Sequence, residues 1–328
     1  MPTGVAPTHA PADSRLATPD PRDESRIPHP ESRERRRAYL AWATVCVVWG
    51  TTYLAIRIAL ESIPPLLMAA MRYTTAGSIL ALTLKVRGHR LPGPRAWPSL
   101  VVLGVLLLGF GNGGVVWAEQ TVPSGLTAVL VATSPFWITG IDLILGGERL
   151  TARRWIGLLV GFCGIVALVW EDLQVGDRRA FLVGVVASQV ACIGWAVGSL
   201  YARRRGHGDA REENVLATAA FEMLFGGLAL FLAAAAHHEY GALTVTVRSA
   251  SALAYLIVFG AVVGFTAYAY ALKHLPVATV SLYAYVNPVI AVFLGVLILN
   301  EPFGVRDVMA AAVGFTGVAL VRQPSDSA

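Results

Sequence analysis

The sequence predicts an all-α integral membrane protein in which ten transmembrane helices form two inverted five-helix repeats. Of its 328 residues, 55% are hydrophobic and only 14% are charged, whereas soluble domains carry about 25% charged residues. The apolar residues form ten continuous stretches, each long enough to cross a hydrocarbon core about 30 Å thick. A soluble globular protein is therefore excluded, as is a transmembrane barrel, whose strands would alternate in polarity.

The chain is expected to divide into two repeats between terminal tails. Residues 1–38 contain many prolines and charges but no apolar run, which predicts a disordered cytoplasmic tail. The first repeat is expected over 39–170 and the second over 181–322, with a cytoplasmic tail at 323–328. The predicted spans are 39–58, 64–84, 97–117, 123–145, 155–170, 181–202, 215–236, 252–272, 276–299 and 305–321.

Basic residues mark the boundaries of these spans and predict their orientation. With the amino terminus in the cytoplasm, the inner side receives twenty Lys and Arg residues, in the tail and after spans 2, 4, 6, 8 and 10. The outer side receives four. Because basic residues are retained in the cytoplasm, this excess predicts both termini inside a multi-pass plasma membrane protein.

An internal repeat supports the division into halves. A shift of 153 residues superposes Pro123 on Pro276, Pro135 on Pro288 and Glu148 on Glu301 without a gap. Trp49 and Arg57 similarly match Trp195 and Arg203. Since five spans is an odd number, the second half enters the membrane from the opposite side, as in transporters that alternate access around a central site.

Prolines and glycines are expected to shape the bundle. Pro135 and Pro288 lie within spans and free the carbonyls of Val131 and Ala284, which could contact a solute or form a purely structural kink. Small residues four apart, such as Gly157 and Gly161, allow close helix packing. Their two interpretations are packing within the chain and a homodimer face on spans 5 and 10.

A set of motifs is distributed over both halves of the chain. Its members are Trp49-Gly50, Met71-Arg72-Tyr73, Pro135, Glu148-Arg149-Leu150, Gly161, Gly164, Pro288, Glu301-Pro302, Gly314 and Gly317. These motifs resemble the drug/metabolite transporter superfamily, and the chain is identified as a permease with two tandem EamA-type domains over about residues 40–322. The resemblance implies ten helices around a central cavity and secondary transport, often export of amino acids or other metabolites. In the second half, Phe221-Glu222 stands where the first half has Met71-Arg72.

Ionisable side chains within spans cost about 2.5–3.5 kcal/mol each at the membrane centre, so they are candidate functional groups. Asp142 or Glu222 could carry a coupling proton, and Arg72 could hold a substrate carboxylate. The alternative for all three is a structural ion pair or a helix-end contact. Arg57 and Glu119 lie nearer span ends and are expected to reach the interface.

Aromatic and amide side chains fall on the spans that the resemblance places around the cavity. Such a lining suits a moderately apolar or zwitterionic solute. For tryptophans at span ends the alternative is anchoring at the membrane interface. The candidate cavity residues are Trp49, Tyr53, Asn112, Ser134, Trp195, Tyr268, Tyr283 and Asn287.

No enzymatic motif, nucleotide-binding segment, metal-ligand spacing or disulfide pattern occurs in the sequence. We therefore expect no cofactor, no metal and no nucleic-acid partner. The function favoured is secondary active export of small metabolites such as amino acids, coupled to protons. The alternatives are multidrug efflux and a non-transporting membrane sensor or interaction protein.

Overall fold

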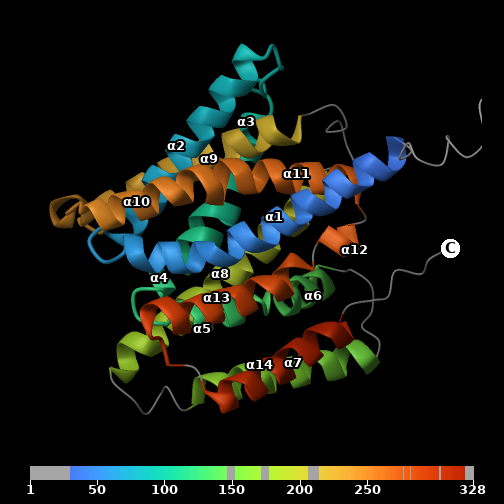
Figure 1. The fold of residues 1–328 in the computed structure, drawn as a ribbon, viewed down its shortest axis with the longest axis vertical. Coiled ribbons are helices and arrows are strands. Elements are labelled where there is room, and N and C mark those ends of the chain that lie inside the picture. The colour runs from blue at the N-terminus through green and yellow to red at the C-terminus, as the bar shows by residue number, and fades with distance from the viewer. Residues whose placement is uncertain are drawn as a thin grey trace, which may run out of the picture.

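The structure is a computed structural model, and it describes residues 30–145, 152–170, 177–205, 214–275, 277–280, 282–302 and 304–321. Throughout these ranges the chain forms helices joined by short connections (Figure 1). Glu148, Arg149, Leu150 and Pro276, which carry part of the repeat pattern, lie outside the described residues, as does the predicted tail at 323–328.

The helices follow one another in the order expected for a membrane bundle. Two pairs of helices form two longer continuous helical segments, because the π-helical stretches η2 and η6 join α3 to α4 and α10 to α11. The elements are α1 (Pro30–Ala59), α2 (Pro65–Val86), α3 (Trp97–Leu103), η2 (Gly104–Asn112), α4 (Gly113–Ala118), α5 (Ser124–Val131), α6 (Ser134–Ile144), α7 (Ala152–Trp170), α8 (Arg178–Arg205), α9 (Val215–Ala236), η5 (Glu239–Ala242), α10 (Val247–Tyr255), η6 (Leu256–Val263), α11 (Gly264–His274), α12 (Val277–Val280), α13 (Tyr283–Leu299) and α14 (Val305–Val321).

Seven helical segments in the described part of the chain are long and apolar enough to cross a membrane. Each has 21 to 28 residues, and about 20 are needed to span the hydrocarbon core. The shorter α13 is also apolar, with 17 residues. The chain is therefore a multi-pass membrane protein.

Helix α1 begins earlier than the sequence predicts. The expected tail extended to residue 38, but residues 30–38 are already helical. Pro30 occupies the first helical position, where its missing N–H costs no hydrogen bond. The Glu and Arg residues that follow have high helix propensity. Because they are polar, hydropathy does not indicate that the helix extends into this segment.

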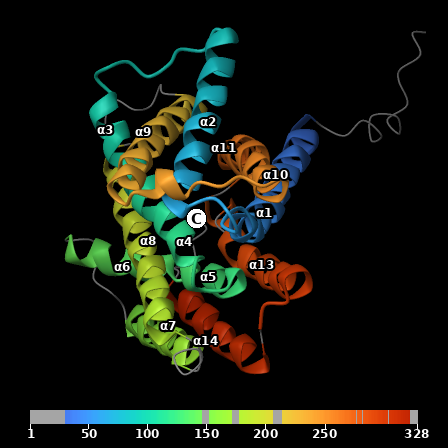
Figure 2. The same cartoon turned by 90° about the vertical axis from the view of Figure 1, so that its left-hand side faces the viewer.

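Helices from the two halves of the chain are interleaved. Helix α1 packs against α11 and α13, whereas α8 packs against η2, α4 and α6. In Figure 1, α1 runs diagonally between α11 and α13, and Figure 2 shows α8 alongside α4 and α5. The centre of the bundle is therefore bounded by elements from both halves.

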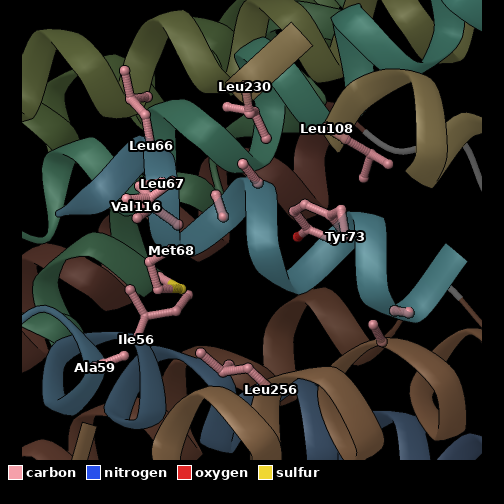
Figure 3. Close-up of a cluster of buried hydrophobic side chains, with 14 of the residues drawn as sticks. Ile56, Ala59, Leu66, Leu67, Met68, Tyr73, Leu108, Val116, Leu230 and Leu256 are labelled. Carbon is pink, nitrogen blue, oxygen red and sulfur yellow. The ribbon is translucent and has the colours of Figure 1, made fainter. Parts of the chain in front are cut away.

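The largest apolar core lies where α2 meets α1, α4, α9 and η6. Met68 and Tyr73 of α2 are fully buried there, together with Val116 of α4 and Leu256 of η6 (Figure 3). Because lipid is as apolar as these side chains, such contacts stabilise the bundle through close van der Waals packing. Ile56, on the same core, also faces the central cavity described below, so this core forms one wall of the site.

Helices α7 and α14 pack side by side at one edge of the bundle (Figure 1). A Cβ on Gly317 would collide with the backbone of Gly161, so the two helices approach too closely for any larger residue at that position. The small-residue face of α7 is thus occupied by α14 of the same chain. This favours packing within the chain as the reason for the small-residue pattern at Gly161.

The two prolines within predicted spans act differently. At Pro135 the helix is broken, because α5 ends at Val131 and α6 begins at Ser134. The carbonyl of Val131 that the proline leaves free accepts a hydrogen bond from Oγ of Ser134 (2.6 Å). Pro288, by contrast, lies inside the continuous helix α13. The break at Pro135 opens the backbone beside the central cavity.

Candidate functional site

A cavity of about 290 Å³ lies between the helices of both halves. Its walls come from α1, α2, η2, α4, α5, α6, α8, α11 and α13. Aromatic and small apolar side chains predominate, and a few polar groups are distributed among them. Such a composition is typical of a small-molecule site. The polar and aromatic lining residues are Trp49, Thr52, Tyr53, Arg72, Asn112, Ser134, Cys192, Trp195, Phe265, Tyr283 and Asn287.

Trp49 on α1 forms the centre of an aromatic wall. Its ring contacts the rings of Phe265, Tyr268 and Tyr283 at centroid distances of 5.4, 5.3 and 5.0 Å. Its indole Nε1 donates a hydrogen bond to the carbonyl of Gly260 (3.1 Å) within π-helix η6. These contacts hold the indole in one orientation at the edge of the cavity.

Glycine is required beside this tryptophan. A Cβ on Gly264 would collide with Nε1 of Trp49, and a Cβ on Gly260 would lie 3.0 Å from an Nη atom of Arg72. The π-helical segment thus brings its backbone close to both side chains. Isolated π-helical turns occur frequently at functional sites.

Trp195 occupies the corresponding position on α8 and also lines the cavity. Its ring lies against Gly111 of η2, where an added Cβ would be 3.4 Å from the indole. The neighbouring Asn112 donates from Nδ2 to the carbonyl of Leu107, five residues earlier (3.2 Å). Each cavity tryptophan therefore packs against a π-helical segment from the other half of the chain.

Two polar groups at the α5, α6 and α13 walls are held by backbone carbonyls. In the amide orientation that satisfies its hydrogen bonding, Asn287 donates to the carbonyls of Tyr283 (3.0 Å) and Cys46 (3.1 Å), which ties α13 to α1. Ser134 donates to Val131 as described above. Both side chains therefore face the cavity with defined geometry.

Arg72 is the cationic group of the cavity. It lies within α2 and is only 4% exposed. Its Nε has no hydrogen-bond partner, and in the described part of the chain no carboxylate forms an ion pair with it. Its guanidinium carbon lies 4.9 Å from the ring centre of Tyr73, a cation–π contact. A buried guanidinium with an unpaired donor is suited to bind an anionic group of a solute.

The remaining predicted site residues lie outside the cavity lining. Tyr268 stands behind Trp49, in ring contact with it and with Tyr283. Asp142, near the end of α6, forms an ion pair with Arg203 of α8 at 2.6 Å. Glu222 lies on α9, on the stretch whose backbone packs closely against Gly104 at the start of η2.

Glu119 is placed differently from the sequence expectation. It was expected to reach the membrane interface, but it is fully buried in the turn between α4 and α5. Neither carboxyl oxygen has a hydrogen-bond partner. Burial and the nearby Glu301 charge raise the pKa of Glu119 well above its usual range, while Arg57 and Arg72 act in the opposite direction. The sequence already shows that Glu119 is far from other acidic residues along the chain, since no other Asp or Glu occurs between positions 62 and 141.

Glu301 has a role that only the structure reveals. Helix α13 ends at Leu299, and Asn300 adopts a left-handed conformation (φ 53°) that turns the chain back. The Glu301 carboxylate then accepts hydrogen bonds from Ser124 N (2.9 Å), Ser124 Oγ (2.9 Å) and Gly125 N (3.1 Å). It therefore caps α5, a helix whose first residue lies 177 positions earlier in the chain.

Comparisons with known proteins agree with this architecture. The model of the EamA-like transporter family matches residues 36–170 and 182–323. An uncharacterized inner membrane transporter of Escherichia coli K12, YedA, is 35% identical over 276 residues, covering 84% of this chain and 87% of YedA. A protein of Streptantibioticus cattleyicolor named a probable terminal-alkyne amino-acid exporter is 26% identical over 286 residues, covering 86% and 93% of the two chains.

A solved crystal structure has the same fold, with a TM-score of 0.59 at 22% identity, over 86% of this chain and 95% of the other. The family match occurs twice and covers most of the sequence, once in each half. The chain is thus a membrane transporter that belongs to the EamA-like transporter family.

Proposed function

We propose that this protein is a secondary transporter that moves one small solute bearing an anionic group through the central cavity. The observation that carries the proposal is Arg72, a buried guanidinium without an ion pair in the described structure, facing a cavity walled by Trp49 and Trp195. A solute carboxylate would satisfy Arg72, and its apolar part would contact the aromatic rings.

The proposal includes ten spans in two inverted repeats, with both termini in the cytoplasm. The pairing of each cavity tryptophan with a π-helical segment of the opposite half supports it, because equivalent contacts then recur on both sides of the cavity. Rocking of the two halves would expose the cavity alternately to the two sides of the plasma membrane.

A metabolite such as an amino acid is the proposed cargo, and export is the proposed direction. The cavity volume of about 290 Å³ lies at the lower end of the usual range of about 300–1,000 Å³ for ligand pockets. The name of the Streptantibioticus relative points to the same solute class. Multidrug efflux is the alternative, but the charge of Arg72 and the small volume favour a compact polar solute.

Coupling to the proton gradient also belongs to the proposal. Asp142 and Glu222 are the carriers favoured by the sequence, and they can be tested by replacing both with their amides. Loss of pH-driven flux in the double variant would support one of them as carrier. Intact pH-driven flux would exclude both.

Metabolite profiling tests the transport proposal. We expect cells expressing the protein to release one class of compound into the medium, and the double variant Trp49→Ala/Trp195→Ala to abolish this release at equal membrane levels. Trp155→Ala is the matched control, because Trp155 lies on α7 away from the cavity and is half exposed. Equal profiles for all three proteins would refute the proposal.

A deletion separates transport from the interaction-protein alternative. Removing residues 2–32 takes away the amino-terminal tail and leaves every cavity residue in place. A transporter should keep its flux, whereas a scaffold that depends on the tail should lose its function.

A further inference from the structure

Glu119 lies between two cavities. Tyr53 and Arg72, which interact electrostatically with it, line the central cavity. Arg57 and Glu301, which also interact with it, line a second cavity of about 320 Å³ at the end of the bundle. Glu119 itself lines neither cavity and is fully buried. It therefore belongs to the barrier that separates the solute site from this end.

The barrier is tightly packed, whereas the opposite end of the same span is not. Seven of the eight residues of α5 are buried, and Ala118 and Val122, on either side of the Glu119 turn, are fully buried. Helix α6, which continues the span beyond the break, has no buried residue. The bundle is thus closed at the Glu119 end.

The charged groups that interact with Glu119 come from α1, α2 and the turn before α14. From α1, Arg57 donates through Nη1 to the backbone carbonyl of Glu119, and Tyr53 interacts electrostatically with the carboxyl group. Arg72 approaches from α2 and Glu301 from the turn before α14.

Other charged groups at this end are already engaged or solvated. Glu61 forms an ion pair with Arg248 at 2.9 Å. Arg178 and Arg179, at the beginning of α8, are exposed. None of these groups neutralises the Glu119 carboxyl through an ion pair in the described structure.

The chemistry of the site follows from its packing. A carboxylate that is fully buried without a hydrogen bond loses the solvation of its charge, so burial favours the neutral, protonated acid. If the end of the bundle opens, solvent reaches the carboxyl through the second cavity and the ionised form becomes favourable. Closing this end and protonating Glu119 are therefore linked, each favouring the other.

We propose that Glu119 is the proton-binding site of the transporter. It takes up a proton from the solution at its end of the bundle before that end closes, and it releases the proton toward the central cavity when that cavity opens to the opposite side of the membrane. The proton binds one carboxyl oxygen of Glu119, which becomes neutral, while the Glu301 carboxylate keeps its hydrogen bonds to the amino terminus of α5. The inference rests on the proposed transport function, and it names Glu119 as the coupling group in place of Asp142 and Glu222, the carriers favoured by the sequence.

Cysteine accessibility tests this linkage without depending on transport. Cys46, Cys163 and Cys192 are replaced, and Val122→Cys is introduced as a buried reporter in the barrier. Labelling of the full-length protein in vesicles by a membrane-impermeant maleimide is followed between pH 5 and 9. Dividing each rate by that of the Glu119→Gln protein removes the pH dependence of the thiol itself.

With Glu119 present, we expect the normalised labelling rate to rise with pH, by up to about tenfold per pH unit while the acid is mostly protonated. Glu61→Gln is the matched control. Glu61 also lines the second cavity, but it is half exposed and paired with Arg248, so its replacement should keep the full pH dependence. A normalised rate that is independent of pH would overturn the proposal.

Transport assays then separate this inference from the proposed function. In proteoliposomes, Glu119→Gln should abolish pH-driven flux but retain solute exchange, which needs no net proton movement. Retained pH-driven flux in this variant would overturn the assignment. If the wild-type protein moved no solute but its accessibility still followed pH, the transport proposal would fail while the Glu119 linkage stood. Glu119→Asp retains an ionisable group and should retain pH-dependent labelling. If the Gln variant fails to fold, Glu119→Ala supplies the normalising rate in its place.

Discussion

Replacing Glu301 with Gln should destabilise the closed end of the bundle, because the Glu301 carboxylate accepts three hydrogen bonds from the amino terminus of α5. Ser124 N donates to one oxygen, and Ser124 Oγ and Gly125 N donate to the other. A glutamine amide offers one oxygen and one NH₂ group. Whichever way it is oriented, its NH₂ faces a backbone N–H that then has no acceptor.

The size of the effect follows from these contacts. Hydrogen bonds to charged groups contribute about 1.5–3 kcal/mol each, although bonds that share one carboxylate are not additive. The favourable interaction of a carboxylate with a helix amino terminus adds about 0.3–2 kcal/mol. We therefore expect Glu301→Gln to lower the free energy of unfolding by about 3 kcal/mol. With an unfolding entropy of about 2.1 cal/mol/K per residue, the melting temperature of the chain should fall by about 4 °C.

Thermal unfolding of the purified protein in detergent, followed by intrinsic fluorescence, measures this shift. Glu61→Gln is a suitable control, because its exposed ion pair with Arg248 contributes only about 0–1 kcal/mol. If Glu301→Gln melted within about 1 °C of this control, the capping argument would be refuted. Glu301→Asp should also destabilise, since its shorter side chain cannot span the same three contacts.

Three further predictions concern the cavity and its surroundings. Arg72→Gln should raise KM for a carboxylate solute about tenfold or more in vesicle uptake, because a charge-assisted hydrogen bond is lost. Arg72→Lys should recover part of the affinity, and equal KM values for the wild type and Arg72→Gln would exclude carboxylate binding by Arg72. Gly264→Ala should lower the transport rate at unchanged membrane level by displacing Trp49, and Trp49→Phe in the same protein should recover activity if the collision with the indole is the cause. Asp142→Asn should change the melting temperature by less than about 1 °C, because its partner Arg203 is 58% exposed and the pair is screened by solvent. A larger fall in melting temperature would show that the ion pair between α6 and α8 is structurally important.

The sequence predicts the positions of helices well where hydropathy alone determines them. The described helix α9 covers residues 215–236, and α14 covers 305–321, the same ranges as the predicted spans. Bilayer thickness fixes the length of such segments, and charged residues fix their ends. The prediction is weaker where other forces act, as at α1, whose polar first turns have helix propensity but no apolar signal.

The internal repeat and the family resemblance predict the cavity residues, and most of these residues line one cavity in the structure. Trp49 and Trp195 were matched by the internal repeat, and both line the cavity. Tyr268 is the exception, one layer behind the lining. Sequence spacing assigns a side chain to a helix, but the rotation of that helix against its neighbours decides whether the side chain faces the cavity.

By itself, the sequence determined that this is a multi-pass helical membrane protein, because the cost of placing unpaired backbone groups in hydrocarbon leaves few alternatives. The partners of its ionisable residues were decided only by the tertiary structure. Glu301 caps α5, far away in sequence, and Glu119 is buried between Arg57 and Arg72 instead of reaching the interface. Electrostatic interactions depend on distance and burial in three dimensions, and neither quantity is encoded in the local pattern of residues.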